Sequence, residues 1–248
     1  MCCFSRRVKH VEQTEIFARP LPNGRQALIY SMRIKAAEDL AMILPIPVVQ
    51  PAAEEAVQFV DLHKYPDLFA GLRRAFYIRP PAASPRTPTF AAAPLKVVAV
   101  GGFNASFVPT MRDFSRLDPQ FRLPEGVWEK LGDYARYGFA VFKLRKGEAR
   151  IHPMAFTFPS ARRKELFFPT VHVHDGTVHP EAHFDHALFC QAGSGATHSL
   201  LAWEASQLPA GKFVNATAAR GLIAPEAHLH RKVMAGEHPN RDVWLRVA

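Results

Sequence analysis

Residues 24–48 read GRQALIYSMRIKAAEDLAMILPIPV, and the pattern of this stretch predicts two strands of the fold. Apolar and polar side chains alternate over 24–35, with the cleaner apolar face on the even positions, which predicts a half-buried strand. The almost wholly apolar run at 40–49 predicts a strand buried on both faces up to its two prolines. Residues 12–18 predict a partner strand, joined by the Leu-Pro-Asn-Gly turn at 21–24. The amino-terminal part is therefore expected to form a β-sheet.

The remainder of the chain mixes helical and extended patterns. Apolar residues at helical spacing predict helices over 65–76 and 124–137. Helices and β-hairpins alternate without regular βαβ units, which favours an α+β fold with a mainly antiparallel sheet and a few flanking helices. The further predicted strands lie at 96–103, 105–110, 139–145, 149–158 and 165–174.

Length and composition indicate one domain spanning residues 1–248. Apolar residues make up 48% of the chain, enough for a sizeable core. Residues 78–94 read IRPPAASPRTPTFAAAP, a Pro- and Ala-rich composition typical of an exposed loop or linker.

The net charge of +9 permits contact with acidic partners, but the basic residues are spread along the chain. Short runs such as 162–164 have no nucleic-acid motif beside them, so no specific nucleic-acid partner is expected. The first residues, MCCFSRRVKH, lack the apolar segment of a signal peptide, and no run reaches the roughly 20 apolar residues of a membrane span. A cytoplasmic location with reduced thiols is therefore expected, whereas the oligomeric state has no signal in the sequence.

The stretch HVHDGTVHPEAHFDHALFC at 172–190 concentrates side chains that bind zinc or copper at neutral pH. In a strand, His172 and His174 project from the same face, so both can reach one ion. A turn at 175–176 allows later histidines to fold back, and His183 and His186 share a face if their segment is helical. The candidate metal ligands are His172, His174, His179, His183, His186, Cys190, Cys2 and Cys3.

These ligands predict a transition-metal protein, with zinc or copper as its cofactor. As an enzyme it would be a metal-dependent hydrolase or oxidoreductase acting on a small-molecule or peptide substrate, with Glu181 as general base. An alternative is an amide hydrolase whose nucleophile is Cys2, exposed at the amino terminus after removal of Met1. A third alternative is a non-catalytic binding or scaffold protein whose histidines are incidental.

Two stretches resemble an uncharacterised bacterial family, a domain of unknown function. In 24–48 the resemblance is a strand, an acidic Glu-Asp step and an apolar segment of the LPVPV type. In 124–168 it is a helix followed by strands that end in a HPxxxxF pattern. The resemblance covers about half of the chain and implies a fold rather than an activity.

Overall fold

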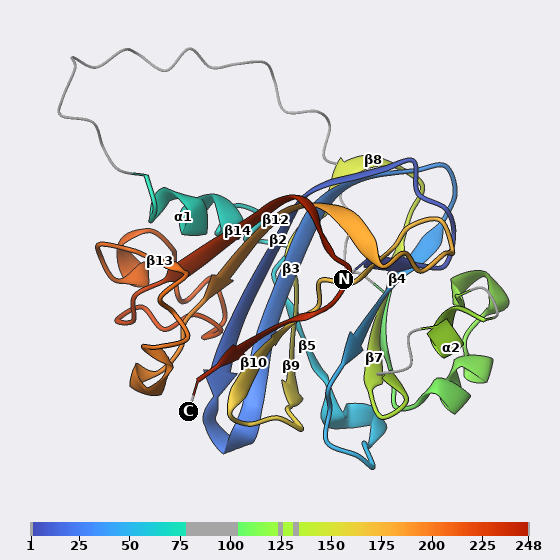
Figure 1. Ribbon diagram of the computed structural model, residues 1–248, viewed down its shortest axis with the longest axis horizontal. Coiled ribbons are helices and arrows are strands. Elements are labelled where there is room, and N and C mark those ends of the chain that lie inside the picture. The colour runs from blue at the N-terminus through green and yellow to red at the C-terminus, as the bar shows by residue number, and fades with distance from the viewer. Residues whose placement is uncertain (1, 78–103, 124–125, 131–133, 248) are drawn as a thin grey trace.

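The structure is a computed structural model, and it describes residues 2–77, 104–123, 126–130 and 134–247. Within these residues the fold is mostly β-sheet, and its α-helices are two short ones, α1 (Leu68–Arg74) and α2 (Val127–Lys130) (Figure 1). The α+β fold class expected from the sequence is therefore wrong. The predicted linker at 78–94 and the predicted strand at 96–103 lie outside the described residues.

The largest sheet has eight strands: β2 (His10–Leu21), β3 (Arg25–Ala36), β5 (Gln58–Asp61), β8 (Gly147–Arg150), β9 (Met154–Pro159), β12 (Glu181–Cys190), β13 (Glu204–Ala205) and β14 (His230–Pro239). Their order in space is β13-β14-β12-β2-β3-β9-β5, and β8 extends the sheet beside β3. The pairing of β12 with β2 is parallel, and the other pairings are antiparallel. Long strands thus occupy the region after residue 180, for which the sequence predicted no strand.

The predicted hairpin at the start of the chain is confirmed. Strands β2 and β3 pair along their length through a turn at Pro22–Gly24. Asn23 and Gly24 both adopt positive φ there, 60° and 69°, a conformation that Asn and Gly tolerate best. A β-bulge between Glu12 and Glu15, with Gln13 at φ 52°, shifts the register of β2. The bulge lies immediately before the buried Glu15.

A second sheet has five strands: β1 (Cys2–Phe4), β4 (Leu40–Ile46), β6 (Asn104–Val108), β7 (Gly138–Leu144) and β11 (His172–Val173). Every residue of β4 is buried, which confirms the strand predicted to be covered on both faces. Strand β1 lies between β11, with which it pairs in parallel, and β4. The first residues of the chain therefore run through the interior of a sheet.

A third, two-stranded sheet pairs β10 (Glu165–Phe168) with β15 (Val243–Arg246). The side-chain amide of Gln26 on β3 ties it to the large sheet, since it donates to the carbonyl of Phe167 and accepts from the Phe167 N–H at 2.7 and 3.0 Å. The strand predicted over 165–174 is thus broken into β10 and β11, which belong to different sheets.

Phenylalanine dominates the interior, in keeping with its 19 copies in the sequence. One apolar cluster lies between the sheets, and a second lies under α1, where Leu68, Phe69 and Leu72 pack with Phe17 and Phe189. Burying each of these large side chains contributes about 1.5–3 kcal/mol to folding. Among the described residues, no helix is long and apolar enough to span a membrane.

Candidate functional site

Three of the predicted histidines meet in the interior, although they belong to different segments. His172 on β11 and His186 on β12 are 8% and 2% exposed, and their Nε2 atoms are 3.0 Å apart. The ring of His174 stacks on His172 with centroids 4.8 Å apart, and Phe184 stacks on His172 at 4.4 Å. The prediction that His172 and His174 lie close together is therefore confirmed.

Burial keeps these imidazoles uncharged. It lowers the pKa of His172 to about 2 and that of His174 to about 4, with the neighbouring positive groups adding to the effect. The pKa of His186 is also lowered well below its ordinary value, again mainly by burial. Since both rings of the pair are neutral, one Nε2 must carry a hydrogen and donate it to the other. The Nε2 atoms of His172 and His186 therefore satisfy one another, whereas the buried Nδ1 of His186 has no hydrogen-bond partner among the described residues.

Two side chains from the segment between β14 and β15 hold β11 in place. The buried carboxylate of Asp242 accepts hydrogen bonds from the backbone N–H groups of Thr170 and Val171, at 2.8 and 3.1 Å. The amide of Asn240 accepts from the N–H of His172 and donates to its carbonyl, at 2.6 and 2.9 Å. These side-chain bonds satisfy backbone groups of β11 and of the residues before it, where no neighbouring strand among the described residues pairs with them.

The other predicted ligands do not join this group. His179 contacts Asp175 at 3.2 Å and His183 contacts Glu237 at 3.2 Å, both on the surface. Because 181–190 is a strand and not a helix, His183 is exposed and His186 buried, on opposite faces. Glu181 is exposed at the start of β12.

The predicted cysteines are also dispersed. Cys190 is buried at the far end of β12, where burial raises the pKa of its thiol. Cys3 is a buried free thiol in β1, and the backbone of Cys2 lies opposite His172. Catalysis by Cys2 or Glu181 stays a prediction, because no contact described here tests it.

This geometry corrects the interpretation of the 172–190 stretch as one metal-binding cluster, whereas zinc or copper as a cofactor stays a prediction. Within the described part of the chain, no group of three or more His, Cys, Asp or Glu side chains is arranged to hold a metal ion. The Nε2 atoms of His172 and His186 face one another at hydrogen-bond distance.

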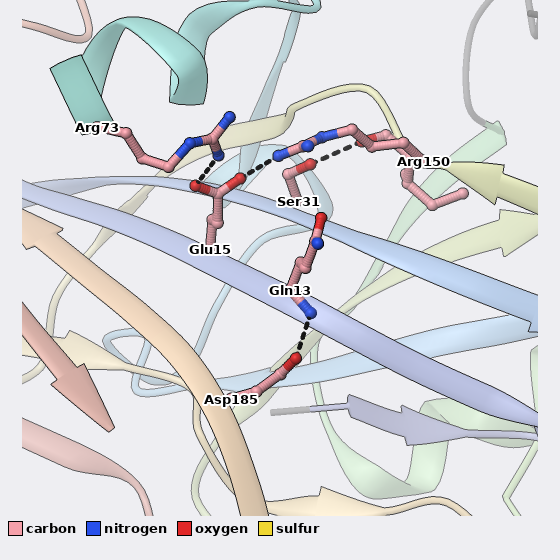
Figure 2. A network of polar contacts seen from close by, with 7 residues as sticks. Gln13, Glu15, Ser31, Arg73, Arg150 and Asp185 are labelled. Atoms are coloured by element: carbon pink, nitrogen blue, oxygen red, sulfur yellow. Dashed lines mark hydrogen bonds and ion pairs between the residues drawn. The ribbon is translucent and has the colours of Figure 1, made fainter. Parts of the chain in front are cut away.

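A second polar centre, which the sequence did not reveal, surrounds Glu15 (Figure 2). Its carboxylate is 4% exposed, and it pairs with Arg73 of α1 through one oxygen and with Arg150 of β8 through the other. Beside it, the N–H of Gln13 in the bulge donates to Asp185 on β12 at 2.6 Å. The ion pairs join α1 and β8 to β2, and the Gln13–Asp185 hydrogen bond joins β2 to β12.

Glu15 must be paired because an isolated buried carboxylate is costly. Its two arginines are 35% and 38% exposed, so their outer edges remain in water. The sequence hid this centre because the bulge breaks the alternation of β2, and the arginines lie 58 and 135 residues away. The network anchors α1 to the large sheet.

Two surface hollows are lined by described residues. One, of about 200 Å³, lies between the sheet edges and is lined by Phe59 and Phe142, with Asp61 and His152 as its titratable groups. The other, of about 320 Å³, lies beside β13 and is lined mainly by apolar side chains and His230. The first is below the usual lower limit of about 300 Å³ for small-molecule sites, and the second lies just above it.

Comparison with known proteins shows a likeness of fold alone. No family model and no curated protein matches the sequence, so the resemblance to a bacterial family of unknown function is wrong. Solved structures of baculovirus P35 are among those that match. One crystal structure aligns with a TM-score of 0.55 over 96% of this chain and 97% of P35, at 12% identity. A mutated P35 after caspase cleavage aligns at 0.51 over 96% and 100%, at 10% identity.

Proposed function

We propose that this chain is a non-catalytic protein that binds a protease of the caspase class. The observation that carries the proposal is the likeness of fold to baculovirus P35 over nearly the full length of both chains. One of the similar P35 structures is of a mutated form after caspase cleavage, so a protease acts on that protein. We extend this relationship to the present chain, as a non-catalytic binding protein whose histidines do not act in catalysis.

The arrangement of the polar groups supports a binding role. The buried histidines pair with each other, and the buried Glu15 pairs with two arginines, so both centres stabilise the fold. The two hollows are at the small end of the range for metabolite sites, whereas a protein partner needs only a rigid exposed surface. A β-sheet framework with anchored helix α1 supplies such rigidity, which lowers the entropy lost on binding.

The test is to mix the purified chain with an active recombinant caspase and follow hydrolysis of a fluorogenic peptide. We expect hydrolysis to fall in proportion to the amount of chain added, and a complex to elute ahead of either protein on gel filtration. Mass spectrometry of the mixture then locates any cleavage. A caspase with its catalytic cysteine replaced by alanine is the control, which separates binding from cleavage. Unchanged hydrolysis and separate elution across a panel of caspases would overturn the proposal.

A further inference from the structure

A cluster of cations lies where the two-stranded sheet begins. Arg162, Arg163 and Lys164 form an exposed turn before β10, and Arg246, also exposed, lies opposite Glu165 across the β10–β15 pair. We call these four cations the basic turn. Arg162 contacts Glu165 at 3.4 Å, whereas Arg163 and Lys164 form no ion pair with any residue that the structure describes. The surface therefore carries a local excess of positive charge.

Backbone hydrogen bonds tie the basic turn to three neighbouring segments. The N–H groups of Ser160 and Ala161 donate to the carbonyls of Gly24 and Pro47, at 3.0 and 2.8 Å. After the turn, the N–H of Val247 donates to the carbonyl of Lys164 at 2.8 Å. The cations are thus presented from a fixed backbone, which reduces the entropy lost when a partner binds.

Side-chain packing fixes two of the cations further. The guanidinium of Arg162 lies over the ring of Trp244 at 4.3 Å. Arg163 lies against Gly24, because a Cβ atom at position 24 would be only 2.7 Å from the Nε atom of Arg163. Gly24 therefore serves the hairpin turn through its positive φ and also leaves room for Arg163.

We propose that the basic turn is an interaction surface for a carboxylate-rich, extended segment of a protein partner. Planar guanidinium groups match carboxylates in paired hydrogen bonds, and the local excess of cations is complementary to such a segment. The proposal goes beyond protease binding, and its test uses no protease.

The size and chemistry of the surface favour an acidic peptide over a nucleic acid. Tight nucleic-acid binding draws on about 6–10 phosphate contacts, more than four cations at one turn provide. Single strands also need aromatic rings on which bases stack. Trp244 is already in contact with Arg162 and with Phe167, whose ring centroid lies 4.8 Å away.

The experiment measures binding of a fluorescein-labelled peptide of alternating Asp and Gly by fluorescence anisotropy. We expect saturable binding that weakens as salt rises from about 50 to about 200 mM, because salt screens exposed charges. The variant R163E/K164E should bind at least about tenfold more weakly. The neutral variant R163Q/K164Q should fall between it and the wild type. Circular dichroism verifies that both variants are folded.

The matched control is R145E/K146E, which makes the same change in net charge at the exposed turn between β7 and β8. It should bind the peptide within about twofold of the wild type, because exposed charges beyond the Debye length are largely screened. Equal losses in both charge-reversal variants would overturn the proposal, since they would indicate only a non-specific effect of net charge. Absence of peptide binding, or tighter binding of an oligothymidine of equal length, would overturn it as well.

Discussion

Acidification should destabilise this protein through its buried histidines. The unfolded chain binds protons at these rings with an ordinary pKa of 6.5, whereas burial lowers the pKa of His172 to about 2. The pKa of His186 is lowered as well. Below pH 6.5 the unfolded state therefore binds more protons than the folded state, so the free energy of unfolding falls as the pH falls.

The expected magnitude follows from the same pKa values. A proton bound only by the unfolded state changes the unfolding free energy by about 1.4 kcal/mol per pH unit. Between pH 7 and pH 5, His172 should therefore cost about 2 kcal/mol, and His186, whose pKa is also lowered by burial, should add to the loss. His174, whose folded pKa is about 4, should add to the loss over the same interval.

The assay is urea denaturation at pH 7 and pH 5, followed by tryptophan fluorescence. Carboxylates also respond to pH, so the wild type is compared with H172Q/H186Q, in which the two amides neither titrate nor leave a cavity. The wild type should lose at least about 2 kcal/mol more than this variant between the two pH values. H183Q, at an exposed histidine, is the control and should behave as the wild type does. Equal losses in the wild type and the double variant would refute the reasoning.

Three further predictions concern single sites. E15A leaves the partly exposed Arg73 and Arg150 without their shared carboxylate and should cost about 1.5–3 kcal/mol in urea denaturation, whereas no measurable loss would contradict a buried ion pair. G138A places a methyl group within 2.5 Å of the Phe107 ring, and the overpacking should cost about 1–3 kcal/mol, measurable as a lower Tm. Cys190 is buried and its thiol pKa is raised, so a thiol reagent should modify it only in urea. Rapid labelling of Cys190 in the native protein would contradict this placement.

The local elements at the start of the chain could be predicted because their signals are local. The hairpin of β2 and β3 follows from alternating side chains on either side of a Pro-Asn-Gly turn. The buried strand β4 follows from its continuous apolar run. The fold class could not be predicted in the same way, because β12 and β14 carry polar and charged side chains that resemble a loop, and pairing with each other along ten residues makes them strands.

The candidate site, too, could be predicted only in part from the sequence. That His172 and His174 project together followed from strand geometry, and the structure confirms their proximity. Which other histidine joins them depended on the pairing of β12 with β2, which brings His186 inward and leaves His183 in solvent. The spacing along the chain carries no information about that pairing.

By itself, the sequence determined the chemistry available to this protein: a Phe-rich core, paired strands at the amino terminus and a concentration of imidazoles at 172–190. Only the tertiary structure decided what that chemistry does. It pairs His172 with His186, and it encloses Glu15 between arginines from α1 and β8. The physical reason is that burial and long-range pairing set the charge state and partners of a side chain, and both arise only when segments distant in sequence pack together.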